Sequence, residues 1–329
     1  MNRLVDNFGR THDYLRISIT DRCNLRCRYC MPPGGVDLNP KSELLTFDEI
    51  VRLAEIFVNL GIKKIRLTGG EPLVRKGVEE LCARLAGIPG VQALGLSTNG
   101  VRLFEMAKSL RNSGVQQLNV SLDTLRRDRF AVVALRTGFD SVLRGIEEAK
   151  SVGFPSLKVN TVVMRGFNDD ELLDFVEFAN RYALNVRFIE YMPFWGNGWN
   201  EVQFMPYREM KEIIETKYHL VPLHRNGTIQ GPAKEFLVAG SRAIVGFITT
   251  ISEHFCADCN RVRLTADGRL RNCVFARDGA DLKHLLRCGA SRAEIEESIR
   301  AAVILKWEKH PDVDELVAGQ DRAMVTIGG

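Results

Sequence analysis

The sequence predicts an α/β fold, an incomplete (β/α)6 barrel of the TIM type followed by a smaller C-terminal α+β module. Before residue 192, apolar runs of strand character alternate six times with amphipathic helical stretches, as in parallel βα units. Proline, glycine and tryptophan break this rhythm from Pro193 to Trp199. Beyond the break, residues 236–251 alternate apolar and polar side chains, as paired strands do. We therefore expect a barrel domain over residues 1–192 and a second module over residues 193–329.

The elements of the barrel follow from the same periodicities. The clearest helix start is Thr46, because Glu49 completes a capping box ahead of an apolar helical face, and Gly61 ends that helix. Right-handed βα units of a barrel collect functional groups at the C-terminal ends of their strands. The predicted strands are Leu15–Ile19, Lys64–Thr68, Ala93–Ser97, Gln117–Ser121, Leu157–Val163 and Val186–Glu190.

Composition limits the classes of protein that need considering. The 329 residues are 45% hydrophobic and 26% charged, as in an ordinary globular chain, and the net charge of +4 is too small to predict binding to nucleic acid. No apolar run approaches the length of a membrane span, and Met1 to Thr11 lacks the apolar core of a signal peptide. Six of the eight cysteines fall in two tight groups, which favours metal binding over disulfides. We expect a cytoplasmic protein with no membrane partner.

The first cysteine group is the most informative motif. Cys23, Cys27 and Cys30 form a Cys-x3-Cys-x2-Cys run directly after the first predicted strand. A cubane iron-sulfur cluster takes four protein ligands when its cage is complete, so three thiolates would leave one iron open to another ligand. Structural zinc sites usually pair two Cys-x2-4-Cys halves, which makes a zinc knuckle the weaker interpretation.

The second cysteine group reads Cys256-x2-Cys259-x13-Cys273. Between its last two members, two arginine-rich segments flank Ala266-Asp267-Gly268, the pattern of a hairpin with a glycine turn, and period-two spacing places Arg261 and Arg263 on one face. With Cys288, the three cysteines could instead form a four-thiolate zinc site, although the sequence around Cys288 predicts the end of a helix. We favour a second iron-sulfur cluster with neighbouring guanidinium groups that bind an anionic substrate.

Polar groups also follow several predicted strands. Gly69-Gly70-Glu71-Pro72 follows the second strand, and its two glycines would allow a ligand to approach the backbone closely. The third and fourth strands end at Ser97 and Ser121, and Glu190-Tyr191-Met192 stands at the end of the sixth. Arg66 and Lys158 alternate into the barrel with period two, and cations in the mouth of a barrel require an anion such as a triphosphate.

The first cysteine motif and the Gly-Gly-Glu-Pro segment together resemble the signature of the radical S-adenosylmethionine superfamily. The resemblance implies that the open iron at Cys23, Cys27 and Cys30 chelates S-adenosylmethionine, which is cleaved to a 5′-deoxyadenosyl radical. It further implies that the cofactor contacts fall on Tyr29, Gly70, Ser121 and Met192.

Over nearly the whole chain the resemblance narrows to the GTP 3′,8-cyclase family of molybdenum cofactor biosynthesis. It is carried by residues 21–32 around the first cysteines, the second cysteine group and the terminal Gly328-Gly329. It implies two 4Fe-4S clusters, with Arg261, Arg263, Gly328 and Gly329 in catalytic roles. The GTP contacts implied are Arg16, Arg66, Ser97, Lys158, Arg261, Val262 and Arg263. Ser97 stands where many relatives have threonine, and Val262 would act only through its backbone.

This family resemblance also implies the reaction and the partners. The adenosyl radical would abstract the 3′ hydrogen of GTP, and the ribose radical would attack C8 of guanine to give 3′,8-cyclo-7,8-dihydro-GTP. The protein would be a homodimer, would accept electrons from a donor such as flavodoxin and would pass its product to cyclic pyranopterin monophosphate synthase. Two alternatives stay open, a radical enzyme that modifies peptides and a zinc-stapled RNA-binding protein without catalysis.

Overall fold

The computed structural model describes residues 3–32, 34–223, 231–319 and 321–328. Eleven of the strands in these ranges form one curved sheet in the order β13-β12-β3-β4-β5-β6-β7-β8-β11-β10-β9, and β1 and β2 form a separate hairpin. The strands are β1 Leu4–Val5, β2 Thr11–His12, β3 Tyr14–Ser18, β4 Lys64–Thr68, β5 Ala93–Thr98, β6 Gln117–Ser121, β7 Ser156–Val163, β8 Asn185–Glu190, β9 Leu220–Pro222, β10 Ala233–Val238, β11 Ile244–Ile248, β12 Arg261–Leu264 and β13 Leu270–Arg271.

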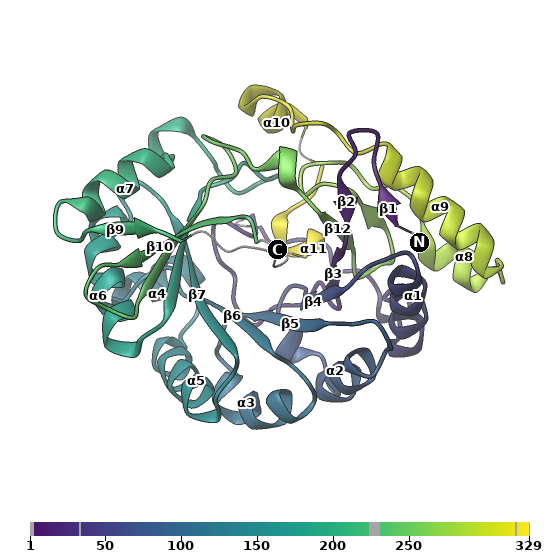
Figure 1. The fold of residues 1–329 in the computed structure, drawn as a ribbon, viewed down its shortest axis with the longest axis horizontal. Helices are drawn as coiled ribbons and strands as arrows, with labels where there is room; N and C mark the ends of the chain where they lie inside the picture. The colour runs from purple at the N-terminus through teal and green to yellow at the C-terminus, as the bar shows by residue number, and fades with distance from the viewer. Residues whose placement is uncertain (1–2, 33, 224–230, 320, 329) are drawn as a thin grey trace.

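The six predicted barrel strands are β3 to β8, and each lies within one residue of its predicted bounds. They pair in parallel and in chain order, which confirms the succession of βα units. Figure 1 shows the sheet curling around a central space, with helices on its outer side. The sheet is therefore an open barrel, as the sequence predicts.

Within the described ranges, the helices before the last one cover the outside of this barrel (Figure 1). The α-helices are α1 Phe47–Asn59, α2 Val78–Ala86, α3 Leu103–Asn112, α4 Arg127–Ala134, α5 Phe139–Val152, α6 Leu172–Tyr182, α7 Tyr207–Glu215, α8 Leu282–Arg287, α9 Arg292–Ile304, α10 Val313–Gly319 and α11 Met324–Ile327. Helix α1 begins at the predicted capping box, in which Thr46 Oγ1 accepts from the Glu49 amide and the Glu49 carboxylate accepts from the Thr46 amide. Of the helices in the described ranges, none is long and apolar enough to cross a membrane.

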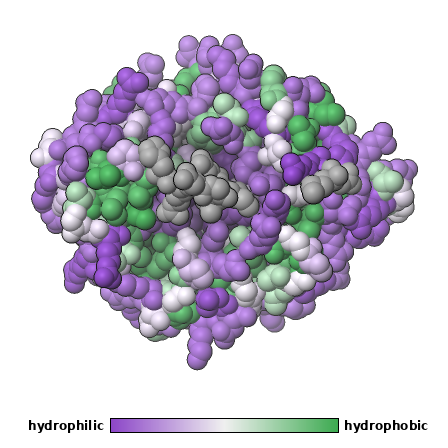
Figure 2. Space-filling view, viewed as in Figure 1, coloured by the Kyte–Doolittle hydropathy of each residue, from purple (hydrophilic) through white to green (hydrophobic). Residues whose placement is uncertain are grey.

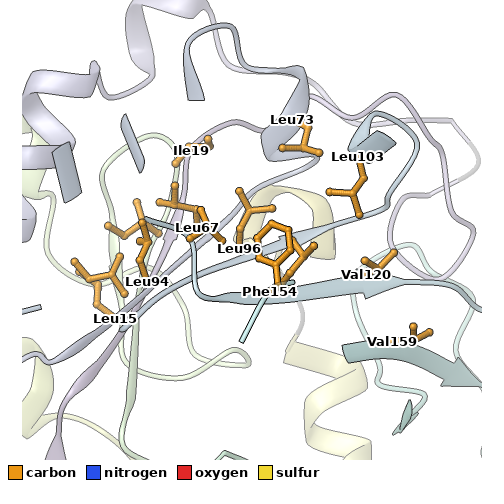
Figure 3. Packing of buried hydrophobic residues seen from close by; sticks show 14 of the residues in the cluster. Leu15, Ile19, Leu67, Leu73, Leu94, Leu96, Leu103, Val120, Phe154 and Val159 are labelled. Atoms are coloured by element: carbon orange, nitrogen blue, oxygen red, sulfur yellow. The ribbon is translucent and has the colours of Figure 1, made fainter. Parts of the chain in front are cut away.

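The hydrophobic core lies between the sheet and these helices. Leucine and valine side chains from neighbouring strands meet residues of the covering layer, as Figure 3 shows for Leu67, Leu96 and Leu103. Leu15, Leu67, Leu96 and Val120 are each fully buried. Side chains alternate between the two faces of a strand. Because these four point outward into the core, the side chains next to them along each strand point into the barrel. The core thus decides which side chains reach the central space.

Residues beyond 192 extend the barrel sheet at both edges. Strand β11 pairs in parallel with β8, and β12 pairs in parallel with β3. The predicted hairpins are confirmed as β10 with β11 and β12 with β13. An incomplete barrel has two open edges whose backbone groups need partners, and these pairings supply them. The C-terminal segment therefore extends the sheet of the barrel.

The end of the described chain lies inside the barrel. In Figure 1 the short helix α11 sits at the centre of the ring, far from the outer helices that precede it. Val325 N donates to the carbonyl of Cys30 at 3.3 Å, which brings this helix against the first cysteine loop.

Candidate active site

A cavity of about 1310 Å³ occupies the inside of the barrel. Figure 2 shows a hollow near the centre of this face of the molecule, in a surface that is largely hydrophilic. Its wall contains the inward positions of successive strands, including Arg16 on β3, Arg66 on β4 and Lys158 on β7. The predicted period-two alternation is thus confirmed for Arg66 and Lys158.

The first cysteine loop follows the C-terminal end of β3, and all three of its cysteines border the cavity. The loop is held by main-chain contacts to the end of α4, since the amides of Arg26 and Arg28 donate to the carbonyls of Ala134 and Val133 at 2.9 and 3.0 Å. It is also held from β4, where the Glu71 amide donates to the Arg22 carbonyl at 2.8 Å. These contacts fix the loop through its backbone and leave the thiols facing the cavity.

The donor set of this loop fits an iron-sulfur cluster. Cys23 Sγ lies 3.4 Å from the Leu25 amide and 3.7 Å from Asn99 Nδ2, both donors that suit a thiolate. Burial raises the pKa of Cys23 to about 11, and it raises the pKa of Cys30 further with the help of the Cys23 thiolate. These three thiols disfavour one another's ionisation, and a bound cationic centre would hold them as thiolates.

The predicted contacts of S-adenosylmethionine border the cavity beside this loop. Tyr29, Gly70, Ser121 and Met192 all belong to its wall. A methyl group at Gly70 would overlap the backbone carbonyl of Arg22, so this close approach requires glycine. The Gly70 amide donates to the Thr20 carbonyl at 2.6 Å.

Two buried carboxylates stand beside the first cysteines. Burial raises the pKa of Glu71 to about 7 and that of Asp123 to about 6. Glu71 accepts from Thr98 Oγ1 at 2.7 Å and from the Asn99 amide at 2.6 Å. Asp123 accepts from the Val162 amide at 2.9 Å and from the Tyr29 hydroxyl. Above these pKa values the two groups place negative charge beside the first cysteines.

The second cysteine group lies at the opposite end of the parallel strands. Cys259 comes two residues before Arg261, which is in register with Tyr14, the first residue of β3. Cys273 comes two residues after Arg271, which is in register with Arg263 on the antiparallel strand β12. Both cysteines thus lie near the N-terminal end of β3, whereas Cys23 follows its C-terminal end. The second group lies at this end because Cys259 comes just before β12, which runs parallel to β3.

The three cysteines of the second group line one small recess of about 40 Å³, and Cys259 borders the large cavity as well. Although burial by itself raises the pKa of Cys259, the charges of Arg261 and Lys306 lower it to about 6. Lys306 Nζ lies 3.4 Å from Cys259 Sγ. The three thiols fit the ligand set of an iron-sulfur cluster. The cations beside Cys259 would favour an anionic ligand on that cluster.

Cys288 is placed apart from this recess. It caps the C-terminus of α8, as the sequence predicts, and its exposed thiol lies 3.6 Å from His284 Nε2. Within the described ranges, no three His, Cys, Asp or Glu side chains are arranged around one point as a single metal ion requires. The cysteines of a cubane cluster bind separate irons, so that arrangement is not the one a cluster needs.

Arg66 is bound across the floor of the cavity. Its guanidinium donates to the Tyr14 hydroxyl at 2.7 Å, to the Leu96 carbonyl at 3.0 Å and to Ser97 Oγ at 3.5 Å. Gly95 on β5 leaves the space for this group, since a side chain there would overlap it. Arg66 and Ser97 are therefore brought together, as predicted, although most donors of Arg66 have partners within the protein.

A second group of charges stands on β7, β8 and β10. Glu235 accepts from Arg187 Nη2 at 2.5 Å and from Lys158 Nζ at 3.4 Å. Burial alone would raise the pKa of Glu235, but these two cations lower it to about 2. Sequence reasoning missed Arg187 and Glu235, although the inward register of Asn185 and Arg187 on β8 would have revealed the arginine.

The remaining predicted residues lie around β12. Arg263 is buried and its Nη1 donates to the Gly328 carbonyl at 2.9 Å. Gly328 has φ of +83°, and a side chain there would overlap Ser18 and Thr68 inside the barrel. Val262 is fully buried on the outer face of β12, and Gly329 lies outside the described residues.

Comparison with known proteins identifies the family of the chain. Residues 17–179 match the radical SAM superfamily, and residues 184–311 match Molybdenum Cofactor Synthesis C. A "GTP 3',8-cyclase" of Thermodesulfovibrio yellowstonii is 46% identical over 99% of this chain and 100% of its own length. The "GTP 3',8-cyclase, mitochondrial" of Arabidopsis thaliana is 45% identical over 99% of this chain and 83% of its own.

Other relatives are longer or more distant. "Molybdenum cofactor biosynthesis protein 1" of Mus musculus is 46% identical over 99% of this chain, which spans about half (51%) of that protein. The crystal structure of Streptococcus suis SuiB superimposes with a TM-score of 0.61 at 12% identity, over 90% of this chain and 67% of that one, and shows the fold alone. The full-length match to the bacterial cyclase shows that the chain belongs to the GTP 3′,8-cyclase family of the radical S-adenosylmethionine superfamily.

Proposed function

We propose that this chain converts GTP to 3′,8-cyclo-7,8-dihydro-GTP, the first step of molybdenum cofactor biosynthesis. The observation that carries the proposal is a cavity bordered by the first cysteine triad at one end and by Cys259 of the second triad at the other, with cations between them. Tyr14 and Ser18, the ends of β3, are about 13 Å apart along the strand. A nucleoside triphosphate is long enough to reach across such a space.

Two 4Fe-4S clusters would be held by Cys23, Cys27 and Cys30 and by Cys256, Cys259 and Cys273. With S-adenosylmethionine bound, the first cluster would supply the electron that splits this cofactor into methionine and a 5′-deoxyadenosyl radical, which would take up the 3′ hydrogen of GTP. The backbone of Gly70, fixed against Thr20 and Arg22, would orient the amino group of this cofactor. Tyr29, Ser121 and Met192 would enclose the rest of it and exclude water.

The cations of the wall would hold the substrate. Arg16, Arg66 and Lys158 face one cavity, which also contains Lys64 and Arg187. Glu235 now neutralises Lys158 and Arg187, and a triphosphate would compete with it for both. Orientation of the ribose toward the first cysteine loop is the main contribution of these residues to the rate.

The second site would hold the guanine end of GTP. Arg261 and Arg263 lie beside Cys259, and the Gly328 carbonyl is fixed by Arg263, so the C-terminal tail reaches the same region. We assign to Arg261, Arg263 and Gly328 the role of enclosing the substrate between the two triads. A domain boundary at residue 192, a homodimer, a flavodoxin-type donor, a cytoplasmic location and transfer of the product to cyclic pyranopterin monophosphate synthase stay predictions.

The proposal is tested by anaerobic reconstitution, iron and sulfide analysis, and product detection with S-adenosylmethionine, a reductant and GTP. About eight irons per chain with cyclised GTP are expected for two 4Fe-4S clusters. About four irons with one zinc would overturn the catalytic role of the second site. About eight irons without turnover of GTP would favour the peptide-modifying alternative.

A variant with Cys256, Cys259 and Cys273 all changed to alanine separates the two sites. It should lose half of the iron and all cyclised product, because the guanine end loses its anchor, while binding of S-adenosylmethionine is largely retained. Equilibrium binding of S-adenosylmethionine and chromatography of the products measure the two effects. Cyclised GTP from this variant would contradict the role of the second triad.

A further inference from the structure

Lys306 is a buried cation that the proposed reaction does not use. It follows α9 at the outer side of the second cysteine group, and only 4% of its surface is exposed. Its ammonium group donates to the carbonyl of Arg261 at 2.7 Å and lies 3.4 Å from Cys259 Sγ. Both contacts are to the segment that carries the second triad, which fixes Lys306 against a proposed cluster ligand.

The charges around Lys306 indicate what this contact does. Burial lowers the pKa of Lys306, the thiolates of Cys259 and Cys273 raise it, and the guanidinium of Arg261 lowers it. The anionic groups that act on Lys306 are therefore sulfur ligands. A buried ammonium is costly unless an anion compensates it, and a cluster-bound thiolate provides that anion.

The N-terminal hairpin holds this arrangement together. Arg10 donates to the carbonyl of Cys256 at 2.7 Å and to the carbonyls of Trp307 and Glu308 at 2.5 and 2.8 Å. It thereby ties the first ligand of the triad to the two residues that follow Lys306. Asp6 in turn accepts from Arg10 Nε at 2.6 Å, and its side chain is fully buried. We call Asp6, Arg10 and His12 the N-terminal clasp.

We infer that Lys306, held in place by the N-terminal clasp, is a positioning residue of the second iron centre, where its charge stabilises the Cys259 thiolate and raises the reduction potential of that centre. The inference rests on the proposed function, since it requires a cluster at the second triad. A positive charge beside a ligand favours the reduced, more negative state of a cluster, and donors around ligands also secure the metal. Lys306 would thus act on the centre without touching the substrate.

The test substitutes Lys306→Met, which keeps the length of the side chain and removes its charge. The exposed Lys309→Met, three residues away, is the matched control. Each is made in the full chain and again in a chain with Cys23, Cys27 and Cys30 changed to alanine, so that the second centre is observed alone. The readouts are the midpoint potential from an electron paramagnetic resonance titration and the rate of iron loss to a chelator.

Lys306→Met should lower the midpoint potential and speed iron loss from the second centre about tenfold, and Lys309→Met should change neither. Arg10→Gln, which loosens the clasp but keeps Lys306, should move both readouts in the same direction by less. Lys306→Arg should restore part of the potential because it restores the charge. Thermal unfolding of the iron-free chain shows whether each variant folds.

Different results would overturn different statements. Iron bound at the second triad with a potential and release rate unchanged by Lys306→Met would overturn this inference and leave the proposed function intact. A wild-type second triad that binds no iron would overturn both. If Lys306→Met does not fold, an unchanged potential in Arg10→Gln would by itself contradict the inference.

Discussion

The two cysteine triads lie at opposite ends of the same parallel strands and in opposite electrostatic surroundings. The charged neighbours of the first triad include the buried carboxylates Glu71 and Asp123, which act on Cys23 and on Cys27 and Cys30. The second has cations, and they lower the pKa of Cys259 to about 6 against the effect of burial. The same ligand chemistry therefore meets a negative environment at one end of the strands and a positive one at the other.

This difference matches two different tasks. Net charge and hydrogen bonds around a cluster set its reduction potential, and negative neighbours make it a stronger reductant. A first centre that reduces S-adenosylmethionine benefits from them, whereas the proposed second centre, if it holds an anionic nucleotide, benefits from cations. The following predictions would break or sharpen this contrast.

The largest effect is expected from Gly70→Ala. The added methyl group would overlap the Arg22 carbonyl, and because that atom is backbone, the loop ahead of Cys23 must move. We expect cleavage of S-adenosylmethionine to fall about 100-fold, with iron at the second triad retained. The formation of 5′-deoxyadenosine measures the loss.

Gly319→Ala is the control for this substitution, because a side chain at Gly319 meets open space. Equal activity of Gly70→Ala and the wild-type chain would show that the close approach of the two loops has no role at the first site.

A smaller effect is expected from Asp123→Asn, which removes a buried charge beside Cys27 and Cys30 and keeps the side-chain volume. The potential of the first centre should rise, and cleavage of S-adenosylmethionine should slow about tenfold. The potential of the second centre should not change. Redox titration followed by electron paramagnetic resonance reports both centres.

The exposed Asp128→Asn, five residues away, is the matched control. If Asp123→Asn shifted the reduction potential of the second centre as much as that of the first, the electrostatic environments of the two centres would not be independent.

The smallest effect concerns pH and the N-terminal clasp. Burial, with the charge of Lys306, lowers the pKa of His12 to about 4, although Asp6 opposes this. In the unfolded chain His12 has its usual pKa of about 6.5, whereas in the folded chain its pKa is about 4. Between these values the unfolded chain binds one more proton than the folded chain, so stability is lost as pH falls from 6.5 toward 4. The free energy of unfolding should drop by about 2 kcal/mol from this group between pH 7 and pH 5.

Denaturant titrations at several pH values measure this dependence. His12→Gln should flatten it, and the exposed His219→Gln should not. A His12→Gln chain with the wild-type pH dependence would show that another group causes the loss.

Local patterns explain what the sequence could predict. The strands β3 to β8, the capping box at Thr46 and the hairpin around Gly268 depend on neighbouring residues, and all are confirmed. The inward direction of Arg16, Arg66 and Lys158 follows from strand periodicity once the buried face is known.

Contacts between distant segments explain what was missed. Lys306 follows an amphipathic helix and looks like any surface lysine until β12 is placed beside β3. The same holds for the clasp, because Arg10 and Cys256 are 246 positions apart. Residues after 192 pair with both edge strands of the barrel. This pairing depends on which strands are left at the edges once the barrel has formed, and no single segment of sequence specifies that.

The pairing of β3 with β12 also has a consequence for how the chain matures. Asn260 Nδ2 donates to Asp13 across 247 positions of sequence, so this edge of β3 has no strand partner until nearly the whole chain has been made. At about 5–20 residues per second, synthesis leaves that edge open for on the order of ten seconds or more. An open edge pairs readily with another chain. The ribosome-bound N-terminal half is thus expected to need protection by a chaperone, and C-terminal truncations before residue 264 should aggregate.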